Sequence, residues 1–160
     1  VIWAADNGMD LSSPLLPPDE LNKIEAGKNY GWPACYGMAV RAAGFATSSC
    51  RGTAMPARNL PPHSAPLGLT LIEGGIAGEG RALAIASHGY MPTGHRITLI
   101  PVNARGDLAG QSRDIVFGWT AARGVRPTGT PVGISAAPRG GLYVTEDGNG
   151  TLLRISVRPE

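Results

Sequence analysis

The chain has 160 residues, which is enough for one domain with a sizeable hydrophobic core. Hydrophobic residues make up 42% of it and the mean hydropathy is near zero, a balance typical of a globular protein rather than a disordered one. The formal charge of +2 and the scattered basic residues do not indicate a nucleic-acid partner, and no apolar run is long enough for a membrane span.

The chain opens on a short apolar run at 1–6, "VIWAAD", which predicts a strand. It has no initiator Met and no signal-like segment before this strand. We therefore expect the sequence to be part of a longer protein whose upstream segments pair with its first strand.

Residues 7–65 show little periodicity, and such a length inside a compact domain is usually functional. One part, "DELNKIEAGKNYGWPACYG" at 19–37, has the local pattern of a helix. Two prolines precede Asp19, Leu21 and Ile24 lie three apart, and Gly27 could end the helix.

Two cysteines, Cys35 and Cys50, lie in the same region. They are too few for a zinc site, so they are either two free buried thiols or a disulfide. We favour a disulfide that closes a loop rich in Gly and Ala, which implies an oxidising compartment.

From residue 66 the pattern changes to short apolar runs separated by turns, and no amphipathic helix is predicted. The turn "EDGNG" is a strong hairpin signal, and "VIWAADNG" at the start of the chain echoes "GLYVTEDGNG" near its end. The fold class is therefore all-β, either a sandwich or a β-propeller. The predicted strands are 67–72, 82–87, 95–102, 114–119, 132–137, 141–147 and 151–157.

Five stretches in this order carry a family resemblance: "VIWAADNGMD", "PPDELNKIEAGKNYGWPACYG", "HSAPLGL", "IASHGYMPTGHRI" and "GLYVTEDGNGTLLRI". Together they resemble the soluble glucose/sorbosone dehydrogenases, quinoproteins that use pyrroloquinoline quinone (PQQ) and calcium. The resemblance implies a six-bladed β-propeller, of which residues 1–160 would form the C-terminal portion, roughly the last two to three blades. Residues 1–65 would hold a strand and the long cofactor and metal loops, and residues 66–160 two blades. It also makes 19–24 a strand rather than a helix.

The resemblance also implies a metal site and a cofactor site. The metal loop maps onto "DNGMD", so the carbonyls of Gly8 and Met9 would bind calcium, with Asp19 as a supporting carboxylate; without the resemblance, this would be an ordinary turn. His63 and His88 map onto cofactor-contacting positions, although each could instead be structural. No catalytic residue is expected in this chain, because the family's general base lies on an earlier blade.

A third cofactor contact depends on the register of "VRPTGTPVGI". In one register Arg126 reaches an acidic group of PQQ, and in the other Thr130 takes its place and cannot supply the bidentate cation. The His88 loop, "HGYMPTG", is also shorter than the family's and lacks a Trp-Asn-Arg stretch. We expect His95 to point outward from its strand and to have no role.

The leading functional hypothesis is a periplasmic or secreted PQQ-dependent dehydrogenase that oxidises an aldose or a related sugar aldehyde. Its partners would be the sugar, an electron acceptor and the N-terminal blades of the same propeller, without which the fragment would be inactive. One alternative is a non-catalytic propeller that binds carbohydrate or protein, which the shortened loop and the Thr130 register favour slightly. Another is a calcium-dependent, lactonase-like propeller hydrolase.

Overall fold

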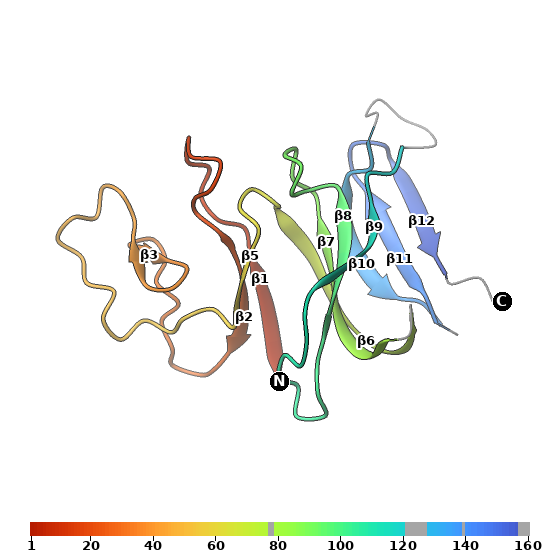
Figure 1. Cartoon of the computed structure of the whole chain (residues 1–160), viewed down its shortest axis with the longest axis horizontal. Coiled ribbons are helices and arrows are strands. Elements are labelled where there is room, and N and C mark those ends of the chain that lie inside the picture. Colours follow the sequence, from red (N-terminus) through yellow and green to blue (C-terminus); the bar gives the residue numbers. More distant parts are fainter. Residues whose placement is uncertain (77–78, 121–127, 139, 157–160) are drawn as a thin grey trace.

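The structure is a computed structural model that describes residues 1–160 except 77–78, 121–127, 139 and 157–160 (Figure 1). Its described residues contain twelve β-strands and no helix, which confirms the all-β prediction. The strands are β1 (Ile2–Asp6), β2 (Asp19–Ile24), β3 (Cys35–Tyr36), β4 (Val40–Arg41), β5 (Arg58–Leu60), β6 (Pro66–Ile76), β7 (Glu79–Ser87), β8 (Arg96–Pro101), β9 (Arg113–Phe117), β10 (Pro131–Ala136), β11 (Leu142–Glu146) and β12 (Thr151–Ile155).

The strands form antiparallel sheets in the orders β1-β2-β5, β3-β4, β6-β7-β8-β9 and β10-β11-β12. The three larger sheets lie side by side, with β6–β9 in the middle, and the small β3-β4 sheet lies beyond β2 (Figure 1). The up-and-down order of β6–β9 is that of a propeller blade. The number of blades in a complete ring stays a prediction.

The central sheet is covered on both faces, and its strand β7 shows how. Ala82, Ala84 and Ala86 belong to the core shared with β10–β12, whereas Leu83 and Ile85 belong to the core shared with β1, β2 and β5. All five are at most 2% exposed. Because side chains alternate along a strand, the sequence "ALAIA" presents small residues to one neighbouring sheet and large ones to the other.

β2 is a strand, as the family resemblance implies, and the helical reading of its local pattern is wrong. Leu21 pairs with Ala5 of β1 and with Arg58 of β5, and its side chain is completely buried in the core against the central sheet. Two partner strands satisfy its backbone, so the tertiary pairing overrides the three-residue spacing of Leu21 and Ile24.

The predicted strands at 1–6 and after residue 66 are all present, with small shifts at their ends. The prediction did not find β3, β4 and β5, which are only two or three residues long. The expectation that His95 points outward from a strand is wrong, because this residue precedes β8 with a φ of 52° and is half-buried. Its Nδ1 lies 2.7 Å from the carbonyl oxygen of Gly129.

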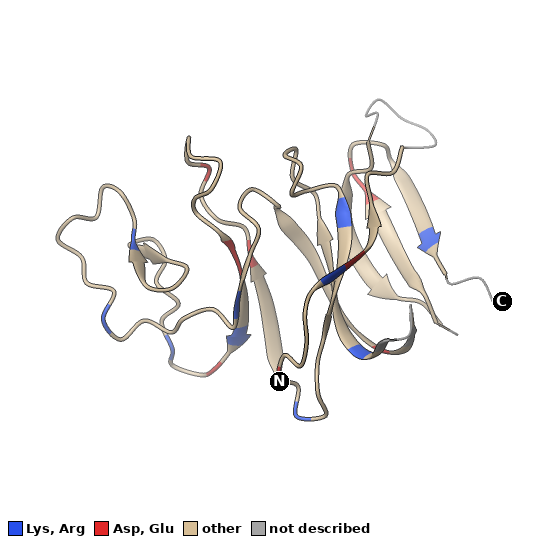
Figure 2. Cartoon of the chain, viewed as in Figure 1, with Lys and Arg blue, Asp and Glu red and all other residues tan. Residues whose placement is uncertain are grey.

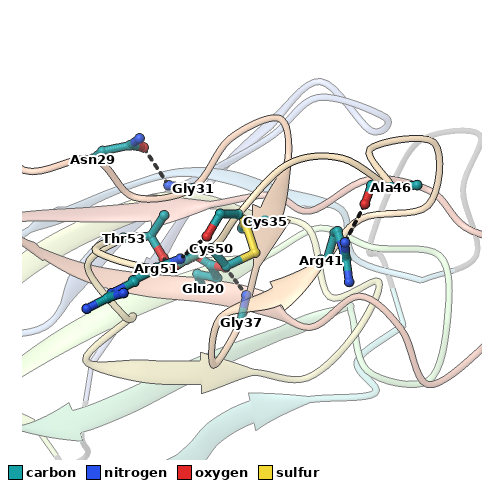
Figure 3. Close-up of a disulfide and its surroundings, with 11 residues drawn as sticks. Glu20, Asn29, Gly31, Cys35, Gly37, Arg41, Ala46, Cys50, Arg51 and Thr53 are labelled. Carbon is teal, nitrogen blue, oxygen red and sulfur yellow. Dashed lines mark hydrogen bonds between the residues drawn. A yellow bond between two sulfur atoms is a disulfide. The ribbon is translucent and has the colours of Figure 1, made fainter.

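The predicted disulfide is present between Cys35 and Cys50 (Figure 3). It closes the loop region that follows β2, and the Gly37 amide within this region donates a hydrogen bond of 2.5 Å to Glu20 Oε1 of β2. The region is thereby tied to the first sheet. Among the described residues, none forms a helix that is long and apolar enough to cross a membrane.

Candidate functional site

One end of the three large sheets carries the loops that follow β1, β5, β7 and β11 (Figure 1). Three of these loops enclose a pocket of about 520 Å³. His63 and His88 both line it, so the structure brings together two of the predicted cofactor residues, which lie on different loops. Asn7 and Asp10, on either side of the predicted metal turn, line the same pocket.

The His63 imidazole is held against the loop that follows β1. Its Nε2 lies 2.8 Å from the carbonyl oxygen of Ser13, so this nitrogen carries the proton and donates it. Its Nδ1 lies 3.7 Å from the Asp10 carboxylate, whose side chain is fully exposed. In the neutral ring Nδ1 is therefore the atom that can accept a hydrogen bond, and in the protonated ring it is a second donor.

His88 is paired with an acidic residue that the sequence analysis did not single out. Its Nε2 donates to Asp147 Oδ1 at 3.0 Å, and the residue is only 8% exposed. Desolvation raises the pKa of the Asp147 carboxyl, but the hydrogen bonds from His88 and from the Gly148 amide outweigh it, and the pKa lies below its ordinary value. Asp147 thus stays ionised and fixes the tautomer of the His88 ring.

Asp19 joins two of the loops through hydrogen bonds to its carboxylate. Oδ1 accepts the amide of Gly8 at 2.8 Å, and Oδ2 accepts the Ser64 hydroxyl at 2.8 Å and the Ala65 amide at 2.9 Å. The side chain is buried, with the residue 1% exposed. A buried carboxylate with three donors is a strong positional constraint, so Asp19 sets the position of the Gly8 turn relative to His63.

The His88 loop is fixed to the same support by its backbone. The His88 and Gly89 amides donate to the carbonyls of Ala65 and Ser64, each at 2.9 Å. A Cβ placed on Gly89 would lie 2.1 Å from the His63 carbonyl oxygen, so only glycine permits this approach. The two histidines are therefore held at a spacing that glycine at position 89 allows.

One carbonyl of the predicted metal turn has capacity left for a cation such as calcium. The Met9 carbonyl accepts one hydrogen bond, from the Leu11 amide at 3.1 Å, which leaves a lone pair for a cation. Acidic residues gather where β1 and β2 approach this turn (Figure 2). The pKa of Asp6 is raised, chiefly by burial and to a smaller extent by repulsion from the negative charges of Glu20 and Asp19. A nearby cation would reduce this repulsion.

The side chains alone do not make a metal site. Within the described residues, no group of three or more His, Cys, Asp or Glu side chains could hold a metal ion. The predicted calcium site does not require one, since its ligands are backbone carbonyls with Asp19 in support. Asp19 accepts the Gly8 amide through Oδ1 and thereby positions this turn, and its supporting role at a metal stays a prediction.

The described lining of the pocket meets the needs of PQQ only in part. His63 and His88 could donate hydrogen bonds to cofactor carboxylates when protonated, but the described lining residues include no Lys or Arg. Arg126, the predicted third contact, lies outside the described residues. Thr130 is 1% exposed, with its hydroxyl accepting the Gly148 amide at 3.1 Å and its amide donating to Glu146 Oε1 at 3.0 Å.

The only sequence signal for Asp147 is its place in the "EDGNG" turn, a pattern that predicts a hairpin and not a partner for His88. The pairing joins residues 59 positions apart, so it depends on how β7 and β11 are placed. Tyr90 was also missed. The Tyr90 ring lies at the rim of the pocket and faces the His88 ring edge-on, with the two ring centroids 5.2 Å apart. Its centroid lies 6.4 Å from that of the His95 ring.

Comparison with known proteins supports the resemblance at the level of the fold. No family model matches the chain. A protein from Borreliella burgdorferi, described only as uncharacterized, is 28% identical over an alignment of 163 residues. This alignment covers 96% of the present chain and 43% of the Borreliella protein.

Solved structures give the fold directly. A glucose dehydrogenase matches with a TM-score of 0.67 and 20% identity, over 98% of this chain and 40% of its own. The calcium structure of a Trichoderma reesei AA12 family protein matches with a TM-score of 0.68 and 20% identity, over 94% of this chain and 47% of its own. The holo PQQ domain of pyranose dehydrogenase from Coprinopsis cinerea matches with a TM-score of 0.66 and 19% identity, over 95% of this chain and 49% of its own.

The chain therefore has the fold of glucose dehydrogenase and PQQ-domain proteins, as the sequence motifs predicted. It spans less than half the length of each of these proteins and of the Borreliella relative.

Proposed function

We propose that residues 1–160 form part of a propeller quinoprotein that oxidises an aldose or a related sugar aldehyde with PQQ and calcium. One observation carries the proposal: in a fold shared with PQQ-domain proteins, buried Asp19 links the Gly8–Met9 turn to the loop bearing His63, and His88 lines the same pocket. The metal turn and both histidines are the positions that the motifs assign to the site.

In this function each residue has a limited task. The Gly8 and Met9 carbonyls hold calcium, Asp19 keeps their turn in place, and His63 and His88 orient the cofactor by hydrogen bonding. PQQ, when bound, supplies the quinone that accepts hydride from the sugar. The base that takes the hydroxyl proton would come from a segment outside these residues.

The test uses the complete natural protein that contains these residues. Calcium and PQQ are added to the apo-protein, and reduction of a dye is followed with a panel of aldoses. We expect reduction only when both are present, and we expect His63→Ala to weaken PQQ retention. Ser135→Ala is the control, because Ser135 is an exposed residue of β10 that does not line this pocket. Failure to bind PQQ at micromolar concentration would refute the proposal.

A non-catalytic binding propeller is the second candidate. The observation that favours it is the lack of Lys and Arg among the described residues of the pocket, because an anionic cofactor needs positive groups. This candidate predicts sugar binding without PQQ and without dye reduction. A lactonase-like hydrolase would instead hydrolyse a lactone with calcium alone, and the same assay with a lactone substrate distinguishes it.

We propose a periplasmic or secreted location, which the Cys35–Cys50 disulfide supports because disulfides persist in oxidising compartments. Mass spectrometry of the protein from the natural host, alkylated before and after reduction, tests it. Cysteines that react with the alkylating agent before reduction would contradict this location.

A further inference from the structure

A second pocket, of about 430 Å³, lies between β5 and strands β7, β8 and β9 of the central sheet, and no predicted site residue lines it. Such a volume is within the range of small-molecule sites. Its apolar surface comes from Leu60, Pro61 and Ile85. Its uncharged polar lining consists of one amide and five hydroxyl side chains: Asn59, Ser64, Ser87, Thr93, Thr98 and Ser112.

This pocket lies behind the wall of the first one. Ser64 lines the second pocket while its neighbours His63 and Ala65 line the first. Ser87 and His88 are divided in the same way. The two pockets thus share the backbone that follows β5 and β7, and adjacent residues serve opposite sides of it.

The charges in the second pocket balance each other. Arg96 and Asp114 are its only charged residues within the described part of the chain, and they are 2.5 Å apart. Asp114 also accepts the Thr98 hydroxyl at 2.6 Å, and Arg96 donates to the Gly94 carbonyl at 3.2 Å. Because the pair neutralises itself and is held in place, the pocket offers polar groups without net charge, which suits an uncharged ligand.

Several polar groups in the pocket have hydrogen-bonding capacity left over. The Ser87 residue is 4% exposed, and its hydroxyl has no hydrogen-bond partner among the described residues. Ser112 accepts a bond of 2.9 Å from Arg58, which leaves its own hydrogen to donate. The side-chain amide of Asn59 likewise has no hydrogen-bond partner among the described residues. A hydroxyl or side-chain amide that lines a pocket and has capacity to spare can bond the polar groups of a ligand there.

We infer that this second pocket binds an uncharged polyhydroxylated molecule, such as a monosaccharide or a sugar alcohol. Hydroxyl groups of the ligand would bond Ser87, Ser112 and Asn59, and its C–H faces would lie on Leu60 and Ile85. The inference does not depend on PQQ, calcium or oxidation, because the five residues that would contact the ligand line the second pocket and not the first.

The test is ligand-observed NMR, by saturation transfer from the full chain to D-glucose and to sorbitol, without PQQ or calcium. Gluconate and glucosamine are charged comparators. Ser112→Tyr fills the pocket from its exposed rim, and Ser135→Tyr, on the exposed part of β10, is its matched control. Ser87→Ala removes a hydroxyl on which no other described group depends.

We expect saturation transfer to glucose and sorbitol, a weaker signal with the charged comparators, and loss of the signal in Ser112→Tyr alone of the two tyrosine variants. Ser87→Ala should weaken binding about threefold to tenfold, the effect of one hydrogen bond. Absence of transfer at millimolar sugar, or a signal that survives Ser112→Tyr, overturns the inference. Neither result bears on dye reduction with PQQ, so the two proposals fail independently.

Discussion

Substituting Asp19 with Asn tests whether this residue supports the first pocket. The carboxylate accepts three hydrogen bonds, from Gly8, Ser64 and Ala65, and it is almost completely buried. Asn has nearly the same shape but only one acceptor oxygen. Whichever way the amide is turned, at least one backbone N–H then faces an NH₂ group.

The expected loss follows from these contacts. Hydrogen bonds to a charged group contribute about 1.5–3 kcal/mol each, so losing one and weakening the others should lower the free energy of unfolding by about 2–4 kcal/mol. The pKa of Asp6 is raised by burial and by the negative charges of Glu20 and Asp19. Removal of the Asp19 charge therefore reduces the repulsion on Asp6, and this offsets part of the loss. The net effect remains a destabilisation.

The assay is urea unfolding followed by circular dichroism, together with hydrogen exchange of the Gly8 and Ala65 amides. We expect at least one of the two amides to lose protection in Asp19→Asn. Asp10→Asn is the control, because that side chain is fully exposed on the same loop and should change stability by no more than about 0.5 kcal/mol. An Asp19→Asn protein as stable as the wild type, with both amides still protected, would refute the reasoning.

Three further predictions concern stability. Asp6→Asn should stabilise the protein at pH 7, because the pKa of Asp6 is raised in the folded state and folding stability therefore falls as the pH rises through that pKa. The gain in stability should vanish below pH 3.8, the ordinary pKa of the group. Equal urea midpoints of the variant and the wild type at pH 7 would contradict this prediction. Gly89→Ala should cost at least about 2 kcal/mol through the clash with the His63 carbonyl, whereas Gly80→Ala meets nothing and should be tolerated, as thermal unfolding would show. Reduction of the disulfide, which spans 15 positions, should lower the free energy of unfolding by about 2–3 kcal/mol, and unchanged urea unfolding in dithiothreitol would argue against this.

The all-β class and the strands after residue 66 could be predicted because alternation is a local property of the sequence. In β7 the alternation of Ala with Leu and Ile matches two different neighbouring sheets, so the pattern predicts the strand correctly. The local pattern failed at β2. Leu21 and Ile24 lie three apart, as in a helix, and only the pairing with β1 and β5 decides for a strand.

The sequence by itself determined which residues belong to the predicted site, through motifs that resemble a known family. Tertiary structure decided which of them meet: it places His63 and His88 in one pocket, pairs His88 with Asp147, and uses Asp19 to join the loops. It also created the second pocket, whose polar lining comes from four strands and the loops between them. These contacts join positions tens of residues apart, so they follow from sheet packing, on which local sequence patterns carry no information.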